Sequence, residues 1–329
     1  MKSVTCFRHG GPEVLELVEV DTPRPQRNEV LIRVEMIGVN FTDVVHRKGT
    51  ALRQPVAFPF TPGVEVAGEV AEVGEAVQGV AVGAKAMAIV PRGGYAEYVA
   101  APAPFVIPLP AGITMQQAAA LPVQGLAAYH TVLTLGRLAK GERILIEAAA
   151  GGVGTIAVQL AKALGAGQVI AVASSRAKLD LALSLGADVG IDYAQPDWRP
   201  RVVEATEGRG VDLFLDSVGG ARFSENFACL APFGRIVSFG AASGERAVID
   251  SERLSSGCYS VSGYYTACAA SQPGLIGPPI GELVRHLLAK QIELQISAEL
   301  AMADAAEAHR RMENRETTGK LLLVPETRP

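Results

Sequence analysis

Apolar residues follow two different spacings along this chain, one typical of strands and one typical of helices. In residues 144–164 the first is followed directly by the second. Residues 144–148 form an apolar run of strand length, and small residues follow it. In residues 155–164 the apolar side chains Ile156, Leu160 and Leu164 recur at helical spacing. The pattern predicts a strand, a tight turn and a helix in direct succession.

The same spacings divide the chain into three stretches. Up to residue 121, short apolar segments broken by Gly and Pro predict a small, irregular β-rich domain. These segments are residues 30–34, 64–73, 84–90 and 95–99. From 122 to 266, strands alternate with helices, which predicts a parallel doubly wound α/β sheet. Its strands are expected near Ile144, Val169, Val189, Leu213, Ile236 and Tyr259.

Residues 267–329 return to helix, strand, helix and strand. The helices are expected at 280–288 and 303–312, and the strands at 292–296 and 321–324. We expect this stretch to rejoin the first domain, with a substrate cleft between the two domains.

The turn after residue 148 has the chemistry of a phosphate-binding loop. On the fingerprint G-x-G-x-x-G, the glycine positions fall on Ala149, Gly151 and Gly154, so the first is relaxed to alanine. A pyrophosphate needs free backbone N–H groups at a helix N-terminus, and a Cβ there would block its approach. A second apolar run at 168–173 fits the next parallel strand, so the sequence predicts a dinucleotide site.

The residues after that second strand indicate which dinucleotide is bound. An NAD site would carry Asp or Glu there, but this chain has Ser174, Ser175, Arg176 and Lys178. Two cations can pair with a 2′-phosphate, which favours NADPH. In the alternative interpretation, Arg176 and Lys178 are solvated residues that open a surface helix.

Composition and charge narrow the class of protein. With 329 residues, 49% of them hydrophobic, the chain is long enough for two domains with separate cores. A net charge of -4 gives no broad basic field for nucleic acid, despite a local cluster at 309–311. No signal core or long apolar stretch is present, so a cytoplasmic location is expected. The four cysteines are scattered, which indicates reduced structural thiols.

Six segments in a fixed order resemble a known family. They are residues 10–15 (GGPEVL), 38–43 (GVNFTD), 62–68 (PGVEVAG), 148–154 (AAAGGVG), 216–220 (DSVGG) and 233–240 (FGRIVSFG). Over nearly its full length, the chain resembles the zinc-free quinone oxidoreductases, which are related to zeta-crystallin within the medium-chain dehydrogenase/reductase superfamily. The resemblance implies a Rossmann domain at 122–266 and a GroES-like catalytic domain built from 1–121 and 267–329.

The resemblance also implies an activity and part of its residue set, to which His46 is added as the one histidine of a segment expected to face the cleft. Hydride would pass from NADPH to a quinone or an α,β-unsaturated carbonyl compound, and the protein would form a homodimer. The candidate catalytic residues are Asn40, Asp43 and His46. The candidate cofactor-binding residues are Asn40, Gln124, Ala150, Gly151, Gly152, Val153, Gly154, Ser174, Ser175, Arg176, Lys178, Tyr193, Ser217, Val218, Phe239 and Gly240.

Residue types argue against a metal. Zinc-dependent members of the superfamily carry Cys where this chain has Asp43, and His within the segment that here contains Val64 and Glu65. Thiolate and imidazole are the ligands that hold zinc at such sites, and neither is present. No metal is therefore expected, and Glu65 is expected to be a buried carboxylate paired with Arg or backbone amides.

Some positions leave alternatives open. His46 can relay protons near neutrality, or it can be a surface or hydrogen-bonded histidine at the mouth of the site. Tyr193 can line the cofactor or pack on the sheet. Many relatives have Tyr where this chain has Val45, and Thr where it has Ala127. These departures bear on the acceptor, so a specialised enoyl or haloacrylate-type alkene reductase is an alternative, as is an NADPH-binding, RNA-recognising protein with minor reductase activity.

Overall fold

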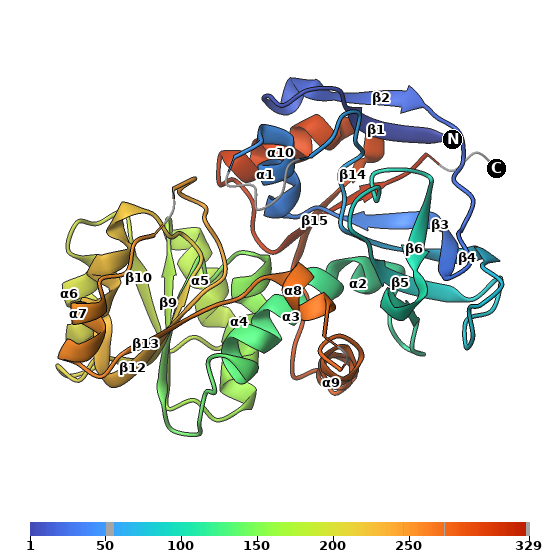
Figure 1. The fold of residues 1–329 in the computed structure, drawn as a ribbon. Helices are drawn as coiled ribbons and strands as arrows, with labels where there is room; N and C mark the ends of the chain where they lie inside the picture. Colours follow the sequence, from blue (N-terminus) through green and yellow to red (C-terminus); the bar gives the residue numbers. More distant parts are fainter. Residues whose placement is uncertain (51–55, 246, 273, 327–329) are drawn as a thin grey trace. The chain divides into compact units, whose positions relative to one another are not determined.

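The structure is a computed structural model that describes residues 1–50, 56–245, 247–272 and 274–326 (Figure 1). It divides into two compact units, each built around its own sheet. The first unit comprises Met1–Val123, Ala270–Leu288 and Ile296–Pro329, and the second comprises Gln124–Ala269 and Ala289–Gln295.

The first unit is rich in β-strands, as the broken apolar segments predict. Its strands are β1 (Lys2–Cys6), β2 (Leu15–Glu19), β3 (Glu29–Gly38), β4 (Glu65–Val73), β5 (Lys85–Ile89), β6 (Tyr98–Pro102), β7 (Val106–Pro108), β14 (Ile296–Ala301) and β15 (Lys320–Val324). Its helices are η1 (Pro12–Val14), α1 (Phe41–Lys48), η2 (Ala103–Phe105), α2 (Met115–Ala120), α9 (Gly277–Leu288), η5 (Met302–Asp304) and α10 (Ala305–Glu313). The expected strand at 292–296 is wrong, because β14 begins only at Ile296.

A seven-stranded sheet organises this unit. Its order is β14-β15-β3-β4-β5-β7, with β6 also paired to β3. The last strand pairs with β3 through Leu322 opposite Gly38 and Leu323 opposite Ile37, so both ends of the chain build one sheet. Apolar side chains of the strands pack with Met302, Ala305 and Ala308 to form its core.

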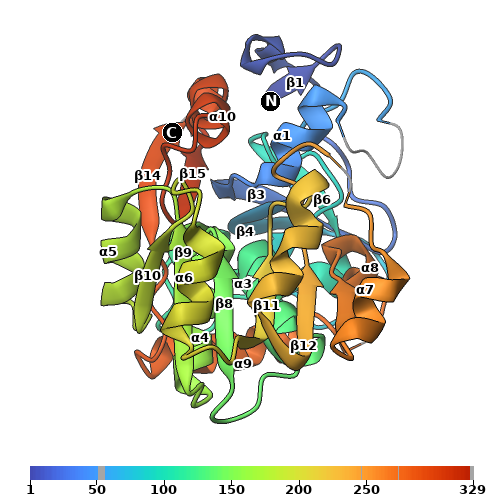
Figure 2. The same ribbon diagram turned by 90° about the vertical axis from the view of Figure 1, so that its left-hand side faces the viewer.

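The second unit is a doubly wound parallel sheet. Its strands are β8 (Arg143–Glu147), β9 (Gln168–Ala173), β10 (Val189–Asp192), β11 (Val211–Asp216), β12 (Leu230–Ser238) and β13 (Ser260–Gly263). Its helices are α3 (Pro122–Tyr129), which begins at the unit boundary, η3 (His130–Thr134), α4 (Gly152–Ala163), α5 (Arg176–Ser184), α6 (Trp198–Ala205), η4 (Ala221–Cys229), α7 (Ser251–Ser256) and α8 (Thr266–Ala270). Figure 2 shows β10, β9, β8, β11 and β12 side by side in that order, and β13 completes the sheet.

Side-chain alternation gives this sheet two buried faces. On one face, strand residues such as Leu145 and Phe214 pack with Trp198 of α6 and Phe223 of η4. The neighbouring strand residue Ile144 is also fully buried, as is expected where helices cover both faces. The expected fold class, a Rossmann sheet with a β-rich domain formed by both chain ends, is confirmed.

One short segment beyond residue 269 groups with the second unit. Gln159 of α4 donates its side-chain N–H to the Glu293 carbonyl (2.9 Å), and the Glu293 N–H donates to the Gln159 side-chain oxygen (2.8 Å). These two bonds fasten Ala289–Gln295 to α4, although the residues on both sides of the segment belong to the first unit.

Candidate functional site

The turn between β8 and α4 brings backbone donors to the carboxyl end of the sheet. Ala148 adopts a left-handed conformation (φ 50), and the Gly151 N–H donates to its carbonyl (2.8 Å). Gly151 then caps α4 without any side-chain hydrogen bond. A Cβ on Gly154 would lie 2.3 Å from the Ala148 oxygen, so only glycine allows the helix to pack this closely. The helix N-terminus is thus open to an anion.

Among the candidate residues of the same unit, two have buried side-chain atoms with no hydrogen-bond partner in the described part of the chain. They are Gln124, at both amide atoms, and Ser217, at its hydroxyl. A buried polar group left unpaired costs about 1–3 kcal/mol, so these groups call for a ligand that supplies partners. Both are candidate cofactor-binding residues, and these unpaired atoms together with the open turn fit a bound dinucleotide.

The loops after β11 and β12 hold four more candidates together. The Phe239 N–H donates to the Asp216 carbonyl (2.9 Å), and the Ser243 N–H donates to the Val218 carbonyl (3.1 Å). A Cβ on Gly240 would lie 2.3 Å from the Ser217 carbonyl oxygen, so the two loops are in direct contact. Ser217, Val218, Phe239 and Gly240 therefore form one continuous backbone surface.

The residues after β9 differ in part from the expected arrangement. Ser175 caps α5, which begins at Arg176 and carries Lys178. Arg176 forms an ion pair with Asp180 one turn later (2.8 Å), so a carboxylate does stand beside one of the two expected phosphate-binding cations. Tyr193 packs against the hydrophobic core of the unit while staying partly exposed, which is compatible with both interpretations of this residue.

The catalytic candidates lie on α1 of the first unit or, for Asn40, at its N-cap, and Asp43 is fully buried. Its Oδ2 accepts from the Asn40 N–H (2.9 Å) and the Tyr95 hydroxyl (3.2 Å), and its Oδ1 accepts from the Gly63 N–H (3.2 Å). Burial raises the pKa of Asp43 to about 7, although these donors and Lys320 oppose the shift. Asp43 thus stands near its titration point at neutral pH.

A buried histidine extends this network. The Tyr95 oxygen lies 3.1 Å from Nε2 of His309, whose pKa falls to about 3 through burial and the nearby Arg47. His309 is therefore neutral. Because the phenol has one proton and donates it to Asp43, the Nε2–H of His309 donates to the Tyr95 oxygen. Sequence reasoning missed both Tyr95 and His309.

Asn40 has both ends of its amide bound within the protein. Its Oδ1 accepts from the Lys320 ammonium (2.8 Å), and its Nδ2 donates to Glu65 Oε1 (2.8 Å). Lys320 also pairs directly with Glu65, and Glu65 Oε2 accepts from the Val123 N–H (2.8 Å). Glu65 is thus a buried, paired carboxylate as expected, but its cation is Lys320 and not an arginine.

His46 lies on the same helix and is half-buried. Its Nδ1 is buried without a hydrogen-bond partner in the described residues. Burial and the Arg92 cation lower the pKa of His46 below its ordinary value, so the imidazole is neutral at pH 7.

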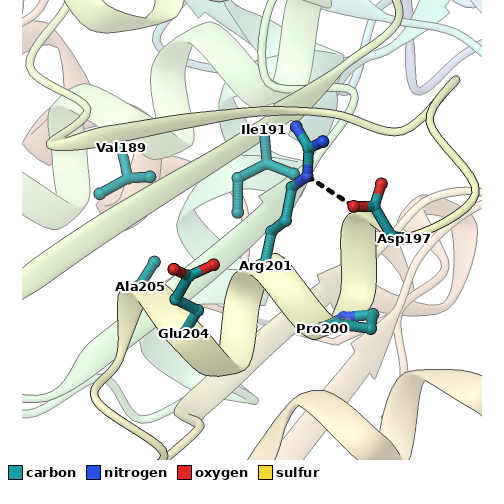
Figure 3. Close-up of a pocket in the computed structure, with 7 residues that line it drawn as sticks. All are labelled: Val189, Ile191, Asp197, Pro200, Arg201, Glu204 and Ala205. Atoms are coloured by element: carbon teal, nitrogen blue, oxygen red, sulfur yellow. Dashed lines mark hydrogen bonds and ion pairs between the residues drawn. The ribbon is translucent and has the colours of Figure 1, made fainter.

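A surface hollow between β10 and α6 lies apart from all of these residues. Figure 3 shows its lining, in which Arg201 pairs with Asp197 (3.0 Å). Its other lining residues are Val189, Ile191, Pro200, Glu204 and Ala205. It contains no candidate site residue, and we assign it no ligand.

Metal-binding side chains are not gathered anywhere in the described ranges. No group of three or more His, Cys, Asp or Glu that could hold an ion is found there. The cysteines are free thiols, with Cys6 and Cys229 buried and Cys258 and Cys268 exposed. None of the helices among the described residues is long and apolar enough to cross a membrane.

Comparisons with known proteins place this geometry in a family. Residues 26–111 match the alcohol dehydrogenase GroES-like domain, and residues 152–273 match the zinc-binding dehydrogenase domain. This pair of domains defines the medium-chain dehydrogenase/reductase class.

Full-length relatives narrow the class further. A quinone oxidoreductase of Pseudomonas aeruginosa is 37% identical, and the match covers 98% of this chain and 99% of the relative. The Escherichia coli quinone oxidoreductase structure complexed with NADPH superposes with a TM-score of 0.94 at 32% identity, covering 99% of this chain and 100% of that one. The Pseudomonas syringae enzyme gives 0.93 at 34% identity, with 98% and 99% covered. The chain belongs to the zinc-free quinone oxidoreductase family and is an oxidoreductase.

The buried ion pair at Asn40 yields a stability prediction. Both side chains are almost fully buried, at 3% exposure for Lys320 and 0% for Glu65. Replacing Lys320 by Met leaves Glu65 as an uncompensated buried charge, so we expect a loss of about 3–5 kcal/mol in the free energy of unfolding. Urea denaturation measures it.

A double-mutant cycle supplies the control for this experiment. Adding Glu65→Gln to Lys320→Met removes the stranded charge, so part of the lost stability should return. Additive losses in the double variant would contradict the assigned pairing.

Proposed function

We propose that this protein uses NADPH to reduce a quinone or an α,β-unsaturated carbonyl compound, without zinc. The observation that carries the proposal is the open glycine turn before α4, accompanied by the unpaired Gln124 amide and Ser217 hydroxyl. Family membership supports it, since the relative from Pseudomonas aeruginosa is named a quinone oxidoreductase. Assembly as a homodimer and a cytoplasmic location stay predictions from the resemblance.

NADPH is preferred to NADH in this proposal. Ser174 occupies the place of the ribose-binding carboxylate, and Arg176 and Lys178 supply positive charge on α5. The solved Escherichia coli relative is an NADPH complex, which supports the same choice. The Asp180 carboxylate reduces the contribution of Arg176 to this preference.

The contacts of the corresponding side chains support independence from zinc. Asp43 accepts three hydrogen bonds from protein donors, and Glu65 neutralises a buried lysine. Neither carboxylate is free to bind a metal ion. Asp43 lies at the position where the zinc-dependent members carry cysteine, and Glu65 lies in the segment where they carry histidine. These residues organise the first unit instead.

The chemistry divides between cofactor and protein. Bound NADPH supplies the hydride. In our proposal, Gln124 and Ser217 bind and orient the nucleotide, and Asn40 is a positioning residue because Lys320 and Glu65 occupy its amide. Neutral His46 holds or passes a proton at Nδ1, and Asp43 fixes the start of α1.

The alkene reductase remains the second candidate for one specific reason. Val45 replaces the tyrosine of many quinone-reducing relatives, which removes a phenol from the segment that contains Asp43 and His46. An acceptor that needs no stacking on that ring would be less affected.

A direct assay tests the proposed activity. We expect purified protein dialysed against a chelator to oxidise NADPH rapidly with 1,4-benzoquinone or 9,10-phenanthrenequinone, and NADH much more slowly, as followed by nicotinamide absorbance. Turnover of a simple enone but of neither quinone would favour the alkene reductase. Activity that is lost on chelation and restored by zinc would contradict the metal-free mechanism.

The 2′-phosphate assignment is tested by a paired substitution on α5. Replacing Arg176 and Lys178 together by Ala should weaken NADPH binding about 10- to 100-fold and leave NADH binding unchanged, because only NADPH carries the phosphate. Calorimetry measures both affinities. Arg201→Ala is the matched control, since Arg201 forms the same type of exposed ion pair one turn from its partner on α6. Equal weakening of both nucleotides would refute the assignment.

The role of His46 predicts a pH profile. Because its pKa is lowered by burial and Arg92, neutral His46 is the working form, and kcat/KM should fall as the pH drops below about 6.5. His46→Gln should lower the plateau and abolish this inflection, whereas the control His286→Gln should leave the profile unchanged. An inflection that survives in His46→Gln returns His46 to a structural role.

A further inference from the structure

The centre of the parallel sheet holds two acidic residues outside the set of candidate residues. In the strand order β10-β9-β8-β11-β12-β13, the chain runs outward from β8 in one direction and from β11 in the other. Connections diverge at such a switch point, and ligands of doubly wound sheets bind outside its carboxyl end. Glu147 is the last residue of β8, and Asp216 is the last residue of β11.

These two carboxyl groups meet inside the protein. Leu215 pairs with Ile146 in the register of the two strands, which sets Asp216 beside Glu147. Their exposures are 7% for Glu147 and 0% for Asp216, and the two carboxyl groups are close enough for a hydrogen bond between them to act on the pKa of each. A hydrogen bond between two carboxyl groups requires a proton on one of them. The pair therefore shares one proton.

The partners of each residue show which one holds that proton. Asp216 accepts from the Ser238 hydroxyl (2.7 Å) and the Gly219 N–H (3.1 Å), whereas Glu147 has only a long contact from the Ser217 N–H (3.4 Å). Burial and the adjacent Asp216 raise the pKa of Glu147 to about 8. At neutral pH, Glu147 is the acid that donates to Asp216, and the pair carries a single negative charge.

Other charged groups around the pair do not neutralise it. On α6, Arg199 is the cation that acts on Glu147, but it is bound to Glu225 (2.7 Å) and Asn226 (2.9 Å). Cys229, at the end of η4, has its pKa raised to about 12 by burial and stays neutral. Between neutral and moderately alkaline pH, the proton on the pair is therefore the one that titrates.

The acid pair also lies directly between the two nucleotide-binding segments of this unit. Glu147 precedes the glycine turn, and Asp216 precedes Ser217, whose buried hydroxyl has no hydrogen-bond partner in the described residues. The pair keeps oxygen lone pairs that can accept, and Ser217 adds a donor. Such a group matches a ligand hydroxyl, which both donates and accepts a hydrogen bond.

We propose that Glu147, Asp216 and Ser217 form a proton-dependent subsite for the dinucleotide, which binds a ribose hydroxyl while the pair holds one proton and repels the pyrophosphate once that proton is lost. This subsite presupposes the function proposed above. It gives Glu147 a role in binding that the glycine fingerprint does not contain.

Nucleotide affinity as a function of pH tests the subsite. From about pH 7 to about pH 9, the NADPH affinity of the wild-type protein should fall about fivefold to tenfold, because a second buried charge faces the pyrophosphate. Glu147→Gln keeps a donor to Asp216 but cannot ionise, so its affinity should stay constant over this range. The NADPH 2′-phosphate, with a pKa of about 6, titrates below the window. The exposed Glu204→Gln on α6 is the control and should behave as wild type.

Stability of the protein without nucleotide provides a second readout. The pKa of Glu147 is raised from its ordinary 4.5 to about 8, so its protonated form stabilises the fold below pH 4.5, and this contribution is lost as the pH rises towards 8. Wild type should therefore lose stability relative to Glu147→Gln across that range in urea denaturation. A difference that does not change with pH would show that no proton is shared, and would overturn the subsite.

The possible failures are distinguishable. The stability difference can change with pH as expected while the NADPH affinities of wild type and Glu147→Gln depend on pH in the same way. In that case the pair is a structural element, and the subsite is refuted while the proposed function stands. If wild-type protein binds NADPH at no pH, the proposed function fails, and the subsite fails with it.

Discussion

The buried ion pair between Lys320 and Glu65 is the interaction on which the first unit depends. It joins the start of the last strand to β4, and Asn40 completes it from the start of α1. Burying two charges is costly unless each finds a partner and further hydrogen bonds, and here Asn40 and the Val123 N–H supply them. The pair therefore fixes the position of the helix that carries the catalytic candidates.

Each unit contains buried acidic side chains, and the two units stabilise these carboxyl groups in different ways. In the first unit, Asp43 is surrounded by donors from Asn40, Gly63 and Tyr95, and neutral His309 completes the network. In the second unit, Glu147 and Asp216 share one proton, which avoids burying two negative charges side by side. Burial raises the pKa of an acid in each case, so each unit holds a carboxyl group that titrates in the range where oxidoreductases work.

Much of the fold could be predicted because it follows local periodicity. The strand, turn and helix from β8 to α4 are visible in apolar spacing and glycine positions, and the family order of motifs supplies the class. The partners of buried polar groups could not be predicted in this way. Lys320 is the first residue of an apolar strand, as many surface lysines are, and Glu147 is the last residue of another. Their roles arise from strand pairings that join residues far apart in sequence, such as β15 with β3 and β8 with β11.

The two units are also interleaved along the chain, which bears on the order in which they can form during synthesis. The second unit lacks only Ala289–Gln295 once Ala269 has been made, so its parallel sheet is complete early. The seven-stranded sheet of the first unit contains β3 and β4, which precede the second unit in the sequence, but it must wait for β15, which lies between β14 and β3. Until Lys320 emerges, Glu65 has no cation. The strands β3 and β4 are therefore made before the second unit but reach their final structure after it.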